Sequence, residues 1–127
     1  MKMVRKKEEQ RTELRENVCG GKGLAQVRNL FEAQEMQDVR LLNHITLDPG
    51  AEFGVHTHHN EAEIYYILSG ELVTEDESGQ HCLSSGDASY TGDGSFHSLK
   101  NTGDSPAELL AVIVGNGSVS MGKTKES

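Results

Sequence analysis

The sequence predicts an all-β domain, built as a sandwich or a barrel, on three observations. Turn-forming clusters of Gly, Pro, Asn, Asp and Ser recur at short, regular intervals between Gly20 and Pro106. The segments between these clusters are mostly about five to ten residues long and are rich in β-branched or aromatic residues. No central segment has the period of an amphipathic helix. Many short strands at this spacing are typical of sandwiches and barrels, the jelly roll among them.

Six segments are predicted as strands because they alternate in polarity or are rich in β-branched and aromatic residues. They are residues 39–47, 63–68, 71–75, 81–83, 95–101 and 107–114. The last segment contains an unbroken apolar run at residues 109–114. Such a run is expected for a strand that is buried on both faces.

The chain of 127 residues is long enough for one domain, and its apolar residues are concentrated in the middle. We expect a polar N-terminal arm at residues 1–17, a single barrel domain at 18–114 and a flexible tail at 115–127. Leu14 is the one apolar side chain between residues 5 and 16, so we expect a frayed or weakly docked segment there, at most a short helix.

Composition and charge exclude several classes of protein. No apolar run is long enough to span a membrane, and the charged start of the chain lacks the apolar core of a signal peptide. Two cysteines, Cys19 and Cys82, are too few for a disulfide framework and favour reduced thiols in the cytoplasm. The net charge of −8 argues against a nucleic-acid partner, which would require a basic face.

The acidic excess lies in the middle of the chain. Between Arg40 and Lys100 there is no Lys or Arg, whereas 10 Asp and Glu residues occur there. A histidine-bearing acidic segment prefers a cation to an anion, although an acidic surface that serves solubility alone is the common alternative.

Three of the six histidines lie within four residues, at His56, His58 and His59. Side chains alternate along a strand, so His56 and His58 point to one face and His59 to the other. Two imidazoles on one face can converge on a single metal ion. The alternative is a surface loop with no ligand.

Two further donors are available from other segments. Glu63 would be well placed if residues 59–62 form a turn that brings the next strand alongside, and His97 lies on a later strand. Three imidazoles and one carboxylate suit manganese, iron, nickel, zinc or copper. An octahedral ion would keep two open positions, which separate a catalytic site from a structural one.

The spacing around these donors closely resembles the two motifs of the cupin superfamily. The first motif is a glycine, five residues, His-X-His, a short gap, a glutamate, six residues and a glycine. It is matched by Gly50, His56, His58, Glu63 and Gly70. The second is matched by Gly86, Gly94, His97 and Asn101, with Gly92 standing where the motif has proline. The short segment between the motifs resembles compact single-domain microbial cupins.

The resemblance implies a double-stranded β-helix barrel with a metal ion at its mouth, bound by His56, His58, Glu63 and His97. It also implies a homodimer, because small cupins are commonly dimeric. Glycine in place of the proline loosens one turn and leaves every presumed ligand in place.

Other residues are candidates for the pocket around the ion. If Glu63 points inward, Tyr65 and Ile67 do so too, and Tyr66 faces outward. Tyr65 could donate a hydrogen bond to a metal-bound substrate, or it could serve packing alone. His44 and Arg40 share one face of the strand before the first motif, and either could line the pocket.

Three other polar residues are expected at the surface instead: His59, Glu61 and His81. The chain has no recognisable Ser-His or Cys-His nucleophile arrangement and no glycine loop that precedes a helix to hold phosphate.

Together these observations predict a small metal-dependent enzyme that acts on an oxygen-chelating molecule, as an oxygenase, isomerase or lyase. Manganese or iron is the expected ion, and zinc, nickel or copper are alternatives. The other candidate is a non-catalytic binding or sensing module. A barrel that keeps these residues without an ion is a third, weaker one.

Two narrower functions are disfavoured. Oxalate decarboxylases resemble two fused cupin barrels, and this chain has room for one. A sugar phosphate would require basic residues, which the middle of the chain lacks unless Arg28, Arg40 or Lys100 reach the pocket.

Overall fold

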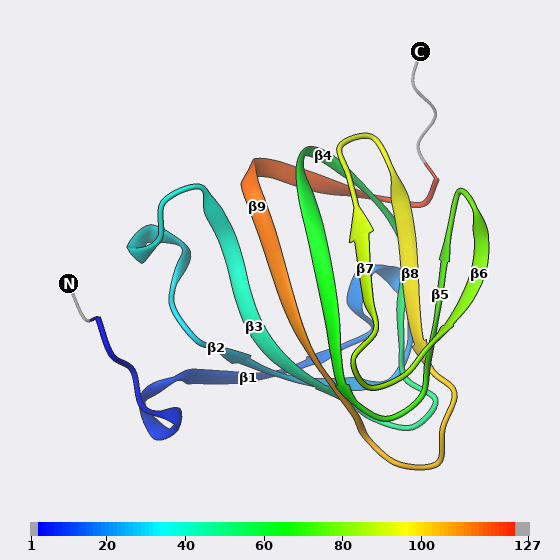
Figure 1. The fold of residues 1–127 in the computed structure, drawn as a ribbon, viewed down its shortest axis with the longest axis horizontal. Coiled ribbons are helices and arrows are strands. Elements are labelled where there is room, and N and C mark those ends of the chain that lie inside the picture. The colour runs from blue at the N-terminus through cyan, green and yellow to red at the C-terminus, as the bar shows by residue number, and fades with distance from the viewer. Residues whose placement is uncertain (1–2, 124–127) are drawn as a thin grey trace.

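The computed structural model describes residues 3–123, and antiparallel strands dominate its regular structure (Figure 1). The strands are β1 (Arg11–Glu16), β2 (Leu24–Asn29), β3 (Val39–Leu47), β4 (Glu52–Ser69), β5 (Leu72–Asp76), β6 (Gly79–Leu83), β7 (Ala88–Thr91), β8 (Phe96–Asn101) and β9 (Ala107–Met121). Three single 3-10 turns are η1 (Lys7–Glu9), η2 (Val18–Gly20) and η3 (Ala33–Glu35). The all-β prediction is therefore confirmed. No helix of the described residues is long and apolar enough to cross a membrane.

The strands form one curled sheet in the order β1-β2-β3-β9-β4-β8-β5-β6, with β7 paired to β4. β4 connects the two sides of the barrel: its start pairs with β8, and the rest of it pairs with β9 and β7. Inward side chains of β2, β3, β4, β5, β6, β8 and β9 make most of the core, which includes Leu47, Ile67, Leu99 and Leu109. The site described below lies on the same inner face, beside this core.

β4 differs from the prediction at its centre. Residues 59–62 do not form a turn; they continue one 18-residue strand that is bent by a bulge. Asn60 has a left-handed backbone (φ 59°), and the pairing of β4 with β9 shifts between His59 and Glu61. Asparagine tolerates this conformation better than most residues, so the extra residue is accommodated without breaking the strand.

The ends of the chain are more ordered than expected. Residues Arg11–Glu16 form β1 and pair with β2 along their whole length, although most of their side chains are exposed. β9 continues past residue 115 to Met121 and pairs with the start of β4. The expected frayed arm and flexible tail are thus wrong for these residues, because backbone pairing holds polar strands at a sheet edge. Residues 124–127 lie outside the described part of the chain.

Candidate metal centre

The four candidate donors meet at one point inside the barrel. His56, His58 and Glu63 come from β4, and His97 comes from β8, where it is the register partner of His56. One ligand atom of each lies within 4.8 Å of the others, and all four residues are buried. The sequence spacing and the fold therefore bring the same four residues together.

The distances within this cluster fit a transition-metal ion. Glu63 Oε1 is 3.0 Å from His58 Nε2 and 3.0 Å from His97 Nε2, and the two nitrogens are 3.1 Å apart. His56 Nε2 is 3.8 Å from the same oxygen. Neighbouring donors of an octahedral ion bound at about 2.1 Å lie about 3.0 Å apart. Three imidazoles and one carboxylate thus form a suitable donor set.

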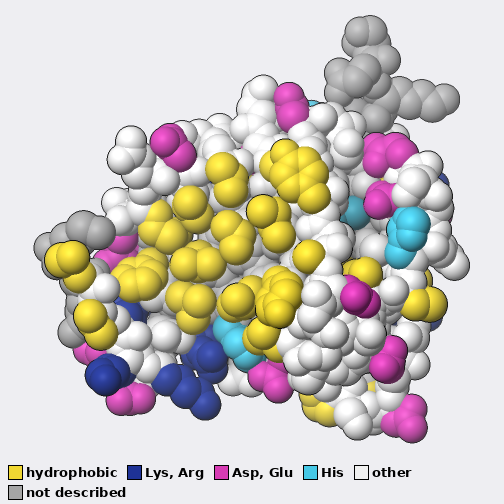
Figure 2. All heavy atoms as spheres, in the orientation of Figure 1, with side chains coloured by type: hydrophobic (Ala, Val, Ile, Leu, Met, Phe, Trp, Pro, Cys, Tyr) yellow, Lys and Arg dark blue, Asp and Glu magenta, His cyan; other side chains and the backbone are white. Residues whose placement is uncertain are grey.

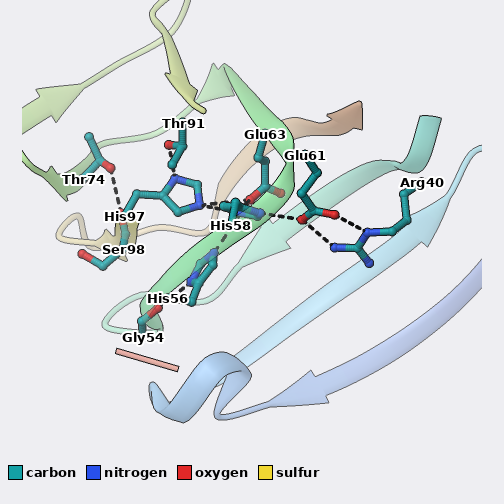
Figure 3. A network of polar contacts seen from close by, with 10 residues as sticks. All are labelled: Arg40, Gly54, His56, His58, Glu61, Glu63, Thr74, Thr91, His97 and Ser98. Carbon is teal, nitrogen blue, oxygen red and sulfur yellow. Dashed lines mark hydrogen bonds and ion pairs between the residues drawn. The ribbon is translucent and has the colours of Figure 1, made fainter. Parts of the chain in front are cut away.

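Hydrogen bonds at the far side of each ring direct Nε2 toward the centre (Figure 3). His56 Nδ1 lies 2.7 Å from the Gly54 carbonyl, and His97 Nδ1 lies 2.7 Å from the Thr91 hydroxyl. His58 Nδ1 lies 2.6 Å from a carboxylate oxygen of Glu61. With Nδ1–H donating in each case, every Nε2 keeps its lone pair for an ion.

Glu61 belongs to this site, and its assignment to the surface was wrong. Its side chain is 0% exposed and lies between His58 and Arg40. Arg40 donates two hydrogen bonds to it, at 2.6 and 2.8 Å. The carboxylate is therefore held by a bidentate ion pair on one side and by the imidazole on the other (Figure 3).

The bulge at Asn60 explains this placement. Beyond it, Glu61 and Glu63 share the inner face of β4, as two residues of equal parity must. The sequence contained this signal, but the expected turn at residues 59–62 concealed it. The other two residues assigned to the surface do lie away from the centre. His59 contacts Ser120, and the side chain of His81 is 47% exposed.

The charges at the centre compensate one another. Burial alone raises the pKa of Glu63, but hydrogen bonds from three histidines outweigh it and hold that pKa well below its usual range. For His56, burial lowers the pKa, and contacts with Cys19, Glu63 and the Gly54 carbonyl outweigh it, raising the pKa to about 10. Without an ion, a proton on His56 therefore balances the Glu63 carboxylate, and metal binding must displace that proton.

Tyr65 lies inward as expected, and Tyr66 and Ile67 take the faces that alternation predicts. The Tyr65 ring stacks on His97, with centroids 4.9 Å apart and planes at 10°. Burial, reinforced by the nearby Glu63 charge, raises the pKa of Tyr65 well above its usual range. Tyr65 thus supports the ring of one donor and keeps its phenolic proton.

His44 and Arg40 lie on different sides of β3 in the structure, and only Arg40 lines the cavity. His44 lies on the outer face of β3, where its Nε2 is 3.0 Å from Glu108 Oε1, and it does not line the pocket. Arg40 does line it, because the pairing of β3 with β9 is irregular between Val39 and Leu41 and alternation is lost there. The expectation for His44 is therefore corrected.

The remaining basic candidates also lie away from the cavity. The guanidinium of Arg28 donates to Gln10, and Lys100 is exposed.

A cavity of about 160 Å³ opens beside the four donors. Its lining residues are Arg15, Val18, Cys19, Val27, Arg40, Leu41, Asn43, Ile45, Phe53, His56, His58, Glu63, Tyr65, Ile113 and Val119. Most of the wall is apolar. Three lining residues could not be predicted from the sequence: Arg15, Cys19 and Asn43. They lie before the first motif, and no spacing rule connects them with the histidines.

Cys19 reaches the cavity because η2 packs very closely on β4. A Cβ atom on Gly54 would lie 2.2 Å from the Cys19 carbonyl oxygen, and one on Gly21 would lie 1.9 Å from the Glu52 carbonyl oxygen. Two glycines facing each other thus permit an approach that no larger residue would allow. The backbone of Cys19 is itself left-handed, with φ 53°.

Comparison with known proteins agrees with this architecture. The cupin domain family matches residues 43–113, which is more than half of the chain. The oxalate-binding protein of Thermotoga maritima is 40% identical over 99 residues, which cover 77% of this chain and 82% of that protein. The fold and the four-donor site define a cupin, and the chain belongs to the cupin family.

Solved structures agree. A crystal structure of a predicted oxalate decarboxylase from Thermotoga maritima superposes with a TM-score of 0.84 at 38% identity, covering 90% of this chain and all of that one (100%). A sugar phosphate isomerase of the cupin superfamily from Silicibacter pomeroyi gives a TM-score of 0.69 at 25% identity, covering 79% of this chain and 66% of that one.

Proposed function

We propose that this cupin binds one divalent transition-metal ion through His56, His58, Glu63 and His97 and acts, as a metal-dependent enzyme, on a small molecule that chelates the ion through two oxygens. The convergence of four buried donors at the edge of a cavity is the observation that carries the proposal. Four protein donors leave two positions of an octahedral ion for a bidentate ligand. When bound, the ion supplies Lewis-acid polarisation of the ligand's oxygens.

The cavity favours a small anionic ligand. Its volume of about 160 Å³ lies below the range of roughly 300–1,000 Å³ of pockets for drug-sized molecules, so a ligand of few carbons fits. Three neutral imidazoles, one carboxylate and a divalent ion give the loaded centre a net positive charge. Arg40 and Glu61 cancel each other, and Arg15 adds a further positive charge to the lining. Apolar walls keep water away from the remaining positions.

Oxalate is the first ligand to test. It presents two adjacent carboxylate oxygens, it is small and anionic, and the 40% identical relative is named an oxalate-binding protein. A single barrel has no second barrel like that of an oxalate decarboxylase, but it can still bind oxalate. For the reaction itself we propose one of three types: that of an oxygenase, an isomerase or a lyase.

Manganese or iron is the ion that we propose. The cluster offers one carboxylate and three imidazoles and contains no thiolate, which would favour softer ions. Zinc, nickel and copper are the alternatives, since all of them accept imidazole. The two free thiols, Cys19 and Cys82, favour a reducing compartment such as the cytoplasm.

A non-catalytic binding module is the second candidate, and one observation favours it. Among the described residues that line the cavity, Glu63 is the one carboxylate, and it is a proposed ligand. Proton transfer to a bound molecule would therefore fall to Tyr65 or Cys19. A site with few proton carriers can hold a chelator without transforming it.

The first experiment measures the metal content of untagged protein that is purified without chelators. About one equivalent of manganese or iron per chain supports the proposal, whereas no metal, and none taken up on titration, contradicts it. The loaded protein is then incubated with oxalate and with other oxygen chelators. Turnover that disappears in Glu63→Gln and in His58→Ala identifies an enzyme. Tight binding without turnover identifies the module.

We also propose that two copies of the chain associate through the outer face of β3, β9, β4 and β7. The apolar run at residues 109–114 is typical of a strand buried on both faces, but in the single chain its outer side chains are only partly buried, and Val114 is 43% exposed. A second copy on this face would bury them.

The outer face is continuous and apolar (Figure 2). Leu42, Val112, Ile64 and Tyr90 are register partners across its four strands, and Leu110, Tyr66 and Ala88 form the adjoining row. Tyr66 and Tyr90 are 44% and 69% exposed, and aromatic side chains bury roughly 150–250 Å² each, so these two alone expose roughly 200 Å². The aliphatic neighbours enlarge this apolar area, and a standard interface buries roughly 800 Å² per partner.

A further inference from the structure

The cavity wall contains a buried amide that the protein leaves unsatisfied. Asn43 lies on the inner face of β3, is 3% exposed and lines the cavity, and its Oδ1 has no hydrogen-bond partner. Its inward neighbours on the same strand, Ile45 and Leu47, are apolar core residues. An unpaired buried polar group destabilises the fold, so an apolar residue would be the expected occupant of this position.

A second buried asparagine shows how this chain treats an amide of purely structural use. Asn101 is 0% exposed, and each of its amide atoms is paired. Its Nδ2 donates to the carbonyls of Leu47 and Ser105, and its Oδ1 accepts from the Gly103 N–H. Asn43 has no such set of partners. Its Oδ1 is buried as it stands, and it has no protein partner to lose when the amide turns toward a molecule in the cavity.

The register of the sheet places Asn43 within reach of a ligand at the ion. Asn43 pairs with Ala111, and Ala111 pairs with Tyr65, so one small side chain separates Asn43 from the tyrosine that stacks on His97. Two strand spacings correspond to roughly 10 Å between the backbones of Asn43 and Tyr65. A ligand of a few carbons that starts at the ion fills this distance.

We propose that Asn43 is a specificity-determining residue that hydrogen-bonds a hydroxyl group of the ligand, and hence that the ligand is a small chelator bearing an additional hydroxyl, such as a polyhydroxy acid. This inference rests on the proposed function and narrows its ligand class. A ligand hydroxyl can donate a hydrogen bond to Oδ1 of Asn43. If the amide is rotated by 180°, the same hydroxyl can instead accept a hydrogen bond from Nδ2. A carboxylate oxygen only accepts, so oxalate alone would leave Oδ1 unpaired.

Lactate and glycerate form a matched pair of probes. Both chelate through a carboxylate oxygen and the 2-hydroxyl, and glycerate has one more hydroxyl in place of a methyl hydrogen. Calorimetric titration of the metal-loaded protein should give about tenfold tighter binding of glycerate, the effect of one hydrogen bond that relieves a buried acceptor. In Asn43→Leu, which has the same number and branching of heavy side-chain atoms but no polar group, the preference should vanish while the metal content stays at that of the wild type.

The outcomes separate this inference from the proposed function. Equal binding of the two acids by the wild-type protein, or a preference that survives in Asn43→Leu, overturns the role of Asn43 alone. A loaded protein that binds neither acid nor oxalate overturns the proposed function and this inference with it. Thermal unfolding without ligand provides a second measurement: Asn43→Leu should be at least as stable as the wild type, whereas a marked loss of stability would show that the amide is structural.

Discussion

At the scale of single residues, the candidate centre depends on side chains that would not touch the ion. Glu61 lies 2.6 Å from His58 Nδ1, while Arg40 holds the carboxylate in place from the other side. Burial raises the pKa of Glu61, but hydrogen bonds from Arg40 and then His58 outweigh it and lower that pKa. The carboxylate therefore stays charged and keeps the His58 proton on Nδ1, which leaves Nε2 for the ion.

Glu61→Gln tests this positioning role. The substitution keeps the shape of the side chain but removes its charge, and we expect metal affinity to fall by about 10- to 100-fold, the usual effect of losing a partner of a metal-binding histidine. Saturating metal should still give one equivalent per chain. Glu108→Gln is the control, because Glu108 pairs with His44 on the outer face. Unchanged affinity in Glu61→Gln, measured by competition with a chromophoric chelator, would contradict the role.

Sequence spacing identified the four donors, but it did not identify the residues that surround them in the structure. The donors are adjacent in sequence or separated by fixed motif spacings, so their positions could be compared with a known pattern. Glu61 could have been found from its parity with Glu63. Asn43 and Cys19 could not, because their approach to the site depends on how β3 and η2 pack against β4, and no local pattern encodes that packing.

At the scale of elements, the predictions succeeded where strands alternate or are apolar. β3 was predicted with its observed bounds, and five other segments overlap observed strands. β1, β2 and β7 were missed: β1 is almost wholly polar, and β7 has only 4 residues. Hydrophobic pattern reports burial, whereas β1 and β7 form mainly through backbone pairing to a neighbour. β2 was missed although it places Ala25 and Val27 in the core.

The close contact between η2 and β4 predicts that adding one methyl group at Gly54 lowers the free energy of unfolding much more than adding one at Gly103. In Gly54→Ala the new Cβ would lie 2.2 Å from the Cys19 carbonyl oxygen, so η2 must move away from the cavity. We expect a loss of roughly 3 kcal/mol or more in the free energy of unfolding, as for other substitutions that force backbone shifts. Gly103→Ala is the control, since its nearest neighbour would lie at an ordinary 3.5 Å. Urea unfolding curves that are the same for both variants would refute the close approach.

An ion pair joins the N-terminal segment to η3 and predicts an acid-dependent stability. Arg5 donates two hydrogen bonds to Glu35, at 2.6 and 2.7 Å, and this contact lowers the pKa of Glu35 to about 2. Because the pKa is depressed in the folded state, the stabilisation is complete above the usual glutamate pKa of about 4.5 and is lost as the pH falls toward 2.

Glu35→Gln should therefore melt below the wild type at pH 6, and the difference should close as the pH approaches 2. Glu8→Gln, at an exposed position of η1 in the N-terminal segment, should melt like the wild type throughout. Thermal unfolding followed by circular dichroism between pH 2 and 6 measures both variants. A difference of constant size over that range would show that the pair does not titrate as described.

At the scale of the whole molecule, the two faces of β4 have different roles. Its inner face carries His58, Glu63 and Tyr65 toward the candidate centre, whereas its outer face presents Ile64 and Tyr66 to the surroundings. Strand alternation sets this division on each side of the bulge at Asn60, and the bulge shifts the parity so that His58 and Glu63 share the inner face. An outer face that is as apolar as a core face is best explained by a partner, which the proposed second copy supplies.

The dimer predicts a selective effect of charge at the centre of the outer face. Wild-type protein should elute with twice the chain mass of 13.9 kDa when light scattering follows gel filtration. Tyr66→Asp places a charge between Leu110 and Ala88 without entering the core, so it should give a folded monomer. Leu14→Asp alters a side chain that is 67% exposed on β1, outside this face, and should leave the dimer intact. A wild-type monomer at high micromolar concentration, or a Tyr66→Asp dimer, would contradict the proposed interface. Because the donors face inward, monomeric Tyr66→Asp should bind the ion as the wild type does, which separates assembly from the metal site.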